Sequence, residues 1–226
     1  MYESSLIFDY SKEPSRDVLC IDCKSFYASC EAVERNLNPL TVKLVVMSYP
    51  SNNVQERGSG LILASSPEAK KAYNISNVSR ARDLPFPYPD DLIIAPPRMN
   101  LYMKKHRQIN AIFRTFVDDQ NISVYSVDET FLDVTDSLAY FGCNTAFELA
   151  RLIQIKVFEE TGIYTTIGIG DNPLLAKLAL DNESKHNKNM KAEWRYDDVQ
   201  NKLWNIQDIT DFWGIGSRTK KRLNAM

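Results

Sequence analysis

Residues 18–31 read VLCIDCKSFYASCE, and this stretch carries the clearest structural signal in the chain. Its first four residues are apolar, which is typical of a central strand, and Asp22 ends that strand. A helix is expected from Phe26 to Arg35, with Ser25 as its N-cap. An unpaired charge at the end of a buried strand is costly, which makes Asp22 a candidate functional residue.

The composition is typical of a folded, soluble protein. The 226 residues are 44% hydrophobic, and no uncharged apolar run reaches the length of about 18 residues that a membrane span needs. The acidic start of the chain does not resemble a signal peptide, so we expect a cytoplasmic location. Cys20 and Cys23 have the C-x-x-C spacing of some zinc and redox sites. Their place on an apolar strand favours small core residues instead.

Net charge does not identify a partner. The formal value is −2, whereas nucleic-acid binders usually present a basic surface. Basic side chains do gather in two segments, residues 104–114 and 218–222. Each cluster suits either a nucleic-acid contact or a solvated helix face.

The order of the expected elements predicts an α/β protein whose sheet is covered by helices on one side. Strands are expected at residues 18–21, 42–47, 61–64, 122–134 and 163–169, and helices at residues 26–35, 65–71, 99–116, 145–162 and 172–185. An apolar stripe from Met99 to Phe116 marks the third helix. Thr145 with Glu148 forms a capping box, and Gly162 is a C-terminal stop. After residue 185, a polar segment that contains tryptophan indicates a separate small helical unit.

Asp128 and Glu129 interrupt an otherwise apolar hairpin. Neighbours in a strand point to opposite faces, so both acids reach one site only at a hairpin tip or a strand end. If they met Asp22 there, the three carboxylates would need a cation, and Mg²⁺ prefers such oxygen ligands. Two such ions can activate an attacking hydroxyl and stabilise the leaving oxygen in phosphoryl transfer. An exposed acidic turn explains the spacing equally well.

Four motifs resemble those of the Y-family, or translesion, DNA polymerases. DCKSFYASCE at 22–31 resembles the family's D-x-x-x-F-Y-A-S-x-E signature, and YSVDETF at 125–131 resembles its catalytic hairpin. TIGIG at 166–170 with LAKLA at 175–179 resembles the next strand and helix, and FWGIG at 212–216 resembles a turn of the thumb domain. The motifs keep the family's order, and the similarity points most to the bacterial SOS-mutagenesis branch, the type of the catalytic subunit of DNA polymerase V.

This resemblance implies a division of the chain. A polymerase palm, an antiparallel or mixed sheet backed by helices in an α+β arrangement, would occupy residues 1–27 and 93–186. A small inserted fingers subdomain would occupy residues 28–92. A partial helical thumb with a helix-hairpin-helix-like turn would occupy residues 187–226, and the family's C-terminal little-finger domain would be absent.

The resemblance also implies roles for individual residues. Two Mg²⁺ ions would be bound by the catalytic acids Asp22, Asp128 and Glu129 and by the backbone carbonyl of Cys23. The incoming nucleotide would be bound by Phe26, Tyr27, Lys70 and Lys185, with Tyr27 as a steric gate beneath the sugar. Phosphates of DNA would be bound by Gly214, Gly216, Arg218 and Lys220. Two finger residues depart from the family: Asn74 stands where a glycine often closes the helix, and Ala64 offers no hydroxyl.

The implied activity is template-directed, error-prone DNA synthesis in DNA repair and the SOS response. Its partners would be primer-template DNA and deoxynucleoside triphosphates, and a sliding clamp or recombinase filament would bind through the missing C-terminal region. Two alternatives stay open. One is a truncated, weakly active or regulatory DNA-binding fragment, and the other is a palm-like nucleotidyl cyclase. A cyclase needs neither a thumb turn nor a sugar gate such as Tyr27.

Overall fold

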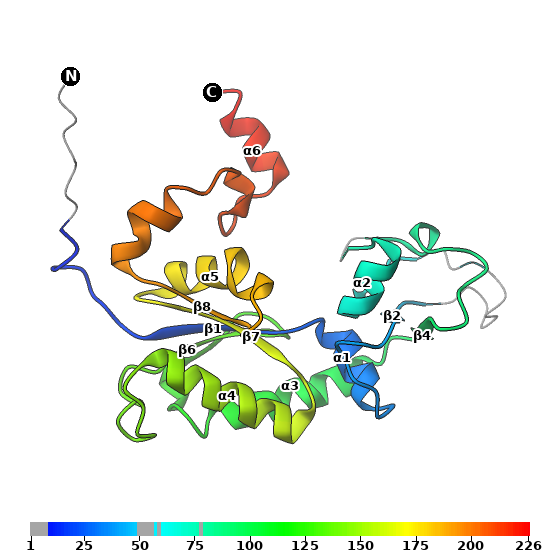
Figure 1. Ribbon diagram of the computed structural model, residues 1–226, viewed down its shortest axis with the longest axis horizontal. Helices are drawn as coiled ribbons and strands as arrows, with labels where there is room; N and C mark the ends of the chain where they lie inside the picture. The colour runs from blue at the N-terminus through cyan, green and yellow to red at the C-terminus, as the bar shows by residue number, and fades with distance from the viewer. Residues whose placement is uncertain (1–8, 49–56, 58–59, 77–78) are drawn as a thin grey trace.

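Two sheets organise the chain. The computed structural model describes residues 9–48, 57, 60–76 and 79–226, so parts of the predicted palm and fingers lie outside the described residues. The larger sheet has the strand order β5-β6-β1-β7-β8, and the smaller sheet has the order β3-β2-β4. Figure 1 shows the larger sheet to the left, the smaller sheet to the right and helix α1 (Phe26–Val33) beside the junction.

Strands and α-helices follow one another along the chain. The strands are β1 (Val18–Cys23), β2 (Leu44–Val46), β3 (Ala64–Ser65), β4 (Ile93–Ala95), β5 (Ile122–Val124), β6 (Glu129–Asp133), β7 (Thr165–Gly170) and β8 (Lys191–Trp194). The remaining α-helices are α2 (Pro67–Tyr73), α3 (Met99–Phe113), α4 (Ala146–Thr161), α5 (Pro173–Asn182) and α6 (Ser217–Leu223). None of the described helices is long and apolar enough to cross a membrane.

Helices cover both faces of the larger sheet, not one face as expected. Leu19 and Ile21 of β1 belong to the core formed with α3 and α4, whereas Val18 and Cys20 belong to a core formed with α5. Figure 1 shows α5 above the sheet and α3 and α4 below it. Strand β1 explains this arrangement, because its apolar side chains point to both faces of the sheet. Both faces must therefore be covered by helices to keep these side chains from water.

Two glycines let α5 pack unusually close to β7. A Cβ built at Gly168 would lie 2.0 Å from the carbonyl oxygen of Ala176, and one built at Gly170 would lie 2.4 Å from the nitrogen of Ala176. Any side chain at these positions would collide with helix backbone. The glycines of the TIGIG segment are therefore packing residues that set the distance between helix and sheet.

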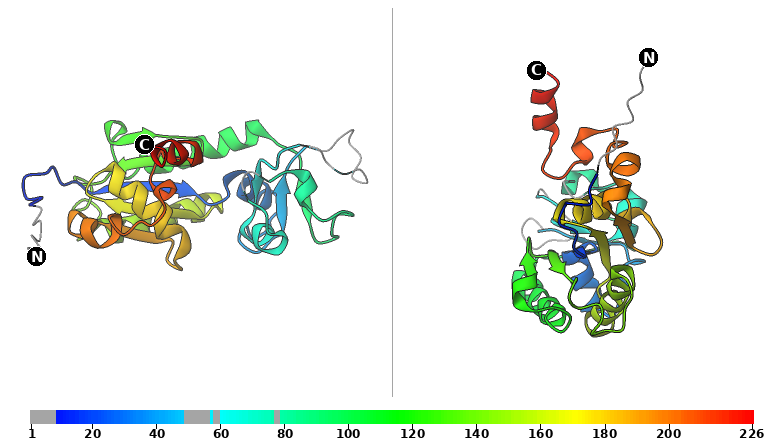
Figure 2. Two further views of the ribbon diagram at one scale, coloured as in Figure 1. Left: turned by 90° about the horizontal axis from the view of Figure 1, so that it is seen from above. Right: turned by 90° about the vertical axis from the view of Figure 1, so that its left-hand side faces the viewer.

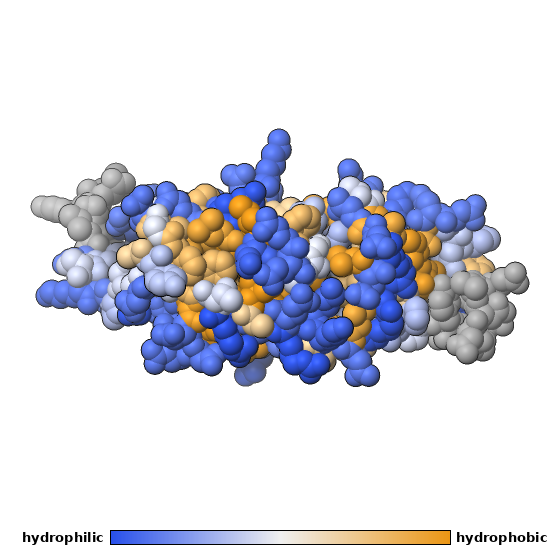
Figure 3. Space-filling model, turned by 90° about the horizontal axis from the view of Figure 1, so that it is seen from below, coloured by the Kyte–Doolittle hydropathy of each residue, from blue (hydrophilic) through white to orange (hydrophobic). Residues whose placement is uncertain are grey.

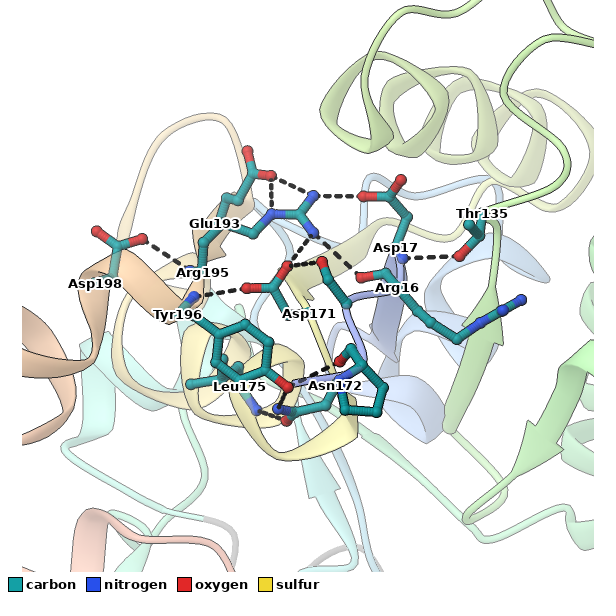
Figure 4. Close-up of polar contacts among 12 residues, drawn as sticks. Arg16, Asp17, Thr135, Asp171, Asn172, Leu175, Glu193, Arg195, Tyr196 and Asp198 are labelled. Carbon is teal, nitrogen blue, oxygen red and sulfur yellow. Dashed lines mark hydrogen bonds and ion pairs between the residues drawn. The ribbon is translucent and has the colours of Figure 1, made fainter. Parts of the chain in front are cut away.

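An ion-pair network joins three strand ends on the side of the sheet where β1 begins. The guanidinium of Arg195 lies 2.5 Å from Asp17 Oδ1 and 3.1 Å from Asp171 Oδ1, and its Nε donates to Glu193 Oε1 at 2.6 Å. Asp171 also accepts a hydrogen bond from the backbone nitrogen of Tyr196 at 2.6 Å. Figure 4 shows Asp17, Asp171 and Glu193 converging on the guanidinium of Arg195. The network fixes the end of β8 against β1 and β7.

The helix-end signals of the sequence are confirmed in part. Thr145 accepts a hydrogen bond from the backbone nitrogen of Glu148, and Gly162 closes α4 with a φ of 70°. The carboxylate of Glu148, however, accepts from Asn144 rather than from Thr145, so the reciprocal bond of the capping box is missing. Ser25 precedes α1 in a left-handed conformation with a φ of 49° and does not cap it with its side chain.

Three borders differ from the sequence expectation. Strand β4 pairs in parallel with β2, so residues 93–95 belong to the smaller sheet rather than the larger one. Strand β8 pairs in parallel with β7, so residues 191–194, which the sequence expectation assigns to a partial thumb, form the edge strand of the larger sheet. Helix α5 ends at Asn182, and Lys185 lies in a following 3-10 turn, Ser184–His186. These two strands are short, which is why apolar periodicity did not reveal them.

The smaller sheet has a core of its own, formed by residues of β2, α2 and the loops around them. Asn74 closes α2 with a φ of 50°, the left-handed conformation that a glycine would also supply. Asparagine adopts this conformation more readily than most residues with a side chain. The departure from the family at this position therefore leaves the helix end intact.

The apolar stripe of α3 is buried only in its second half. Ile109, Ile112 and Phe113 are buried under the larger sheet, whereas Met99 and Met103 are exposed. Figure 3, the view from below, shows apolar patches interspersed with polar surface on this side of the molecule. Helix α3 thus extends beyond the sheet, as the view from above in Figure 2 also shows.

We predict that Gly168→Ala destabilises the protein by about 3 kcal/mol, because the new Cβ would overlap the backbone of α5. The matched control is Gly216→Ala, whose Cβ would have no atom within 4 Å and which should change stability by less than about 1 kcal/mol. Urea unfolding followed by circular dichroism measures both. Equal midpoints for the two variants would contradict the close-packing interpretation.

Candidate active site

A cavity of about 560 Å³ lies between the two sheets, at the end of β1. Its walls come from the strand ends of the larger sheet, from the β1–α1 turn, from the smaller sheet with α2, and from the turn after α5. The lining residues are Asp22, Cys23, Lys24, Ser25, Phe26, Tyr27, Leu63, Ala64, Ser65, Pro67, Lys70, Val127, Asp128, Thr166, Lys185 and His186. Seven of the twelve residues singled out in the sequence are among them.

Strand pairing brings the three predicted acids to one place. In the β1–β6 ladder Asp22 lies directly opposite Glu129, so both side chains leave the sheet on the same face. Asp128 follows the turn next to them, where its carbonyl oxygen accepts a hydrogen bond from the nitrogen of Cys23 at 2.8 Å. Ser126 Oγ donates to the Asp128 carboxylate at 2.8 Å. The acidic hairpin is therefore not an exposed turn but part of a cavity wall.

Asp22 lies near the end of β1, and its side chain is 19% exposed. Burial raises the pKa of its carboxyl to about 6, Lys185 opposes this shift from 3.6 Å, and the charges of Asp128 and Glu129 add to it. The raised pKa reflects mainly the loss of water around this carboxyl, and the two neighbouring carboxylates add to the cost of its negative charge. An added cation would offset that cost.

Glu129 is held away from the cavity. Lys177 Nζ donates to Glu129 Oε2 at 2.8 Å, and Cys20 Sγ donates to Oε1 at 3.3 Å. Both members of the Glu129–Lys177 pair are buried, at 9% and 8% side-chain exposure. Burial alone would lower the pKa of Lys177, but hydrogen bonds to Glu129 and Asp181 outweigh it and raise that pKa. Glu129 thus has an internal partner that the motif alone did not indicate.

Basic side chains line the cavity as well. Lys70 of α2 and Lys24 of the β1–α1 turn are half-buried, and neither has an ion-pair partner within the part of the chain that the structure describes. Burial, and then the charge of Lys24, lowers the pKa of Lys70. Half-buried ammonium groups without partners favour an anion between them. Lys185 differs, because it already contacts Asp181 at 2.8 Å.

Tyr27 is fixed by stacking. Its ring lies 4.4 Å from the ring of Tyr102 at an angle of 19°, and Tyr102 is itself fully buried. The hydroxyl of Tyr102 donates to Glu31 Oε1 at 2.8 Å, and Arg98 holds the same carboxylate. Phe26 lines the cavity too but is only 3% exposed, so it acts mainly as a core residue.

Comparison with known proteins places this geometry in a family. Residues 21–181 match the model of the impB/mucB/samB family, and residues 196–226 match the model of the IMS family HHH motif. The chain belongs to the impB/mucB/samB family. The first match contains every acid and lysine of the cavity except Lys185.

Relatives of known sequence agree with this assignment. UvrX of Bacillus subtilis (strain 168), named for UV-damage repair, is 42% identical over 222 residues, which are 97% of this chain and 50% of UvrX. DNA polymerase IV 2 of the same organism is 36% identical over 92% of this chain and 48% of its own length. The chain therefore spans about half the length of these relatives. A DNA polymerase V branch is not singled out by them and stays a prediction.

Solved structures share the fold. An insertion ternary complex of Dbh DNA polymerase has a TM-score of 0.74 at 28% identity, covering 92% of this chain and 57% of that chain. DinB from Sulfolobus solfataricus has a TM-score of 0.69 at 27% identity with the same coverage. The resemblance to Y-family DNA polymerases, including their palm architecture, is confirmed.

Y-family polymerases generally depend on a divalent metal, and the oxygen donors of this chain fit one in part. Among the described residues, no group of three His, Cys, Asp or Glu side chains is arranged to hold a metal ion. Asp22 and Asp128 supply hard oxygen ligands on the cavity wall, whereas Glu129 is turned to Lys177. The Cys23 thiol is a poor donor for Mg²⁺, which takes oxygen ligands, and burial raises its pKa well above its usual value.

The family's HHH motif forms a turn that packs on the hairpin that carries Asp128 and Glu129. Gly214 has a φ of 83°, and Gly216 precedes α6. Trp213 Nε1 donates to the hydroxyl of Tyr125 at 3.3 Å, and its ring lies 5.8 Å from that of Phe131. The turn therefore packs directly against the hairpin that carries the two acids.

The predicted DNA contacts of this turn are not equivalent. Arg218 is exposed on the first turn of α6. Lys220, by contrast, donates to Asp208 at 2.7 Å within the same small unit. Asp208 is an N-cap whose pKa is lowered by that contact. Lys220 would have to give up this partner to contact a phosphate.

Lys177 is the residue that the sequence reasoning left without a role, although it lies inside the quoted LAKLA motif. A signal was present: lysine at 177, aspartate at 181 and lysine at 185 alternate in sign at intervals of four. Only the fold shows that this row faces Glu129 and Asp22 rather than solvent.

Proposed function

We propose that this chain catalyses template-directed DNA synthesis, joining deoxynucleoside triphosphates to a primer 3′-hydroxyl by two-metal nucleotidyl transfer. The observation that carries the proposal is the polarity of the cavity, with Asp22 and Asp128 on one wall and Lys70 on the other. A nucleoside triphosphate bound with Mg²⁺ presents both kinds of charge and would satisfy both walls. Error-prone synthesis in DNA repair and the SOS response is the context that the family resemblance suggests.

Each wall has a distinct task in this proposal. Asp22, Asp128 and the carbonyl of Cys23 would hold Mg²⁺, and Glu129 would join them after leaving Lys177. The ions would lower the pKa of the attacking hydroxyl and screen the charge on the phosphate. Lys70, and more weakly Lys185, would bind the triphosphate. Most of the rate enhancement would come from positioning and electrostatics, because phosphoryl transfer asks little covalent work of a protein.

The partners follow from the same surfaces. Structures of Dbh are described as ternary complexes with substrates, which supports a DNA- and nucleotide-binding role for the equivalent part of this chain. Here the backbone at Gly214 and Gly216, with Arg218, would hold a DNA phosphate without reading sequence. A sliding clamp or recombinase filament remains a prediction that rests on the family alone.

The first test is primer extension with Mg²⁺ and all four deoxynucleotides. Asp128→Ala combined with Glu129→Ala should lower the rate more than about 100-fold, since it removes charge from the reacting centre. The matched control is Asp118→Ala with Asp119→Ala, another adjacent pair of acids, which is exposed and should leave the rate within about twofold. Extension that survives in the first double variant would overturn the assignment of these acids.

Lys70→Ala should weaken binding of a deoxynucleoside triphosphate about tenfold, equivalent to about 1.4 kcal/mol. The loss should shrink as salt rises, because the contact is electrostatic. Lys71→Ala is the control, since the neighbouring lysine is exposed and does not line the cavity. Fluorescence titration with a labelled nucleotide measures both. Equal affinities for the two variants would remove Lys70 from the site.

Tyr27→Ala should allow ribonucleotides into the site by removing the ring that lies against Tyr102. Discrimination between deoxynucleotides and ribonucleotides in single-turnover incorporation should fall at least about tenfold, while Tyr27→Phe keeps the ring and should retain it. Loss of discrimination in both variants would point to the hydroxyl rather than to ring bulk.

A further inference from the structure

A row of alternating charges links the two acids at the strand ends. Lys177 Nζ lies 2.8 Å from Glu129 and 3.0 Å from Asp181, and Lys185 Nζ lies 2.8 Å from Asp181 and 3.6 Å from Asp22. The row therefore begins on one predicted metal ligand and ends on the other. Its three middle members stand at intervals of four residues on α5 and the 3-10 turn after it.

The position of Lys177 is set by packing. Gly168 and Gly170 allow α5 to approach the sheet closely, and the lysine at 177 then reaches across to β6. Its side chain is 8% exposed. A buried ammonium group is stable only while a carboxylate accompanies it. Lys177 has two such carboxylates, Glu129 and Asp181, from different elements.

Room for movement exists on the Asp181 side. Lys177 and Asp181 both line a neighbouring cavity of about 490 Å³ next to the turn of residues 212–216, whereas Glu129 does not line it. The ammonium group can therefore give up Glu129 and remain paired with Asp181. No buried charge is left without a partner in either arrangement.

We propose that Lys177 is an internal counter-cation for Glu129, which a divalent metal ion displaces toward Asp181 when it binds the catalytic acids. The inference rests on the proposed function only in taking Glu129 as a metal ligand. Lys177 acts through Glu129 and is a positioning residue. Its positive charge offsets the negative charge of Glu129 while the site holds no metal. For the same reason it competes with the metal for the Glu129 carboxylate.

Two effects follow for Lys177→Met. The metal-free protein loses stability, because Glu129 becomes a buried charge without a cationic partner. Divalent metal then binds about tenfold more tightly, because nothing competes for Glu129. Added metal should therefore raise the unfolding temperature of this variant more than that of the wild type.

The experiment uses the full chain without DNA or nucleotide, stripped of metal and titrated with Mn²⁺. Free Mn²⁺ is followed by electron paramagnetic resonance, and unfolding temperature is measured alongside. Lys177→Arg, which retains the charge, should bind Mn²⁺ like the wild type. Lys156→Met removes an exposed lysine of α4 paired with Glu160 and should change neither quantity.

A double-mutant cycle separates competition for Glu129 from a general change in the electrostatic field at the metal site. In a Glu129→Gln background, Lys177→Met should no longer tighten Mn²⁺ binding, because the residue for which lysine and metal compete is gone. Tightening that persists there would overturn the proposal, as would unchanged or weaker binding in Lys177→Met alone. If Lys177→Met does not fold, Asp181→Asn is measured in its place. Without Asp181 as an alternative partner, Lys177 should stay paired with Glu129 and Mn²⁺ should bind more weakly. Unchanged or tighter binding of Mn²⁺ by this variant would count against the proposal.

This outcome is independent of polymerase activity. A chain that shows the Mn²⁺ behaviour but extends no primer would contradict the proposed function and leave the role of Lys177 standing. If the chain extends primers but Lys177→Met binds Mn²⁺ like the wild type, the proposed function stands and the role of Lys177 is contradicted.

Discussion

Crowding of negative charge at the end of one buried strand is the constraint on which the rest of the structure depends. Because β1 pairs with β6 in the register that sets Asp22 opposite Glu129, two carboxylates meet where little water reaches them. Each carboxylate of the group contacts a specific polar neighbour. Lys177 pairs with Glu129, Lys185 lies near Asp22, and Ser126 donates a hydrogen bond to Asp128. Lys177 lies on α5 and Lys185 on the 3-10 turn that follows it, so the close packing of α5 against β7 positions both lysines.

The second sheet completes the site with the opposite charge. Lys70 comes from a lobe with its own core, so its position depends on how that lobe folds and not on the β1–β6 ladder. Tyr27 stands between the two, on α1, and is held by Tyr102 and the ion pairs of Glu31. The cavity therefore receives acids from one unit, a base from another and an aromatic wall from the helix that connects them.

Much of this could be predicted from local sequence. The strand ending at Asp22, the helix after it and the acidic hairpin all have strong patterns within a few residues. Strand β8 could not be found in this way, since four residues with a lysine and a glutamate show no clear alternation and become a strand only beside β7. Likewise, local sequence does not link Lys177 to Glu129 or Lys220 to Asp208, and only tertiary packing reveals these pairs.

The contact between α5 and β7 leaves no space for a side chain larger than hydrogen at Gly168. The wall of the site that carries the acids is therefore intolerant of change, because any growth in that layer would move Lys177 away from Glu129. The facing wall is different: Ala64 is small, and Asn74 already replaces a glycine without loss of the helix end. Substitutions in the smaller lobe can therefore reshape one side of the cavity without moving the acids on the other side.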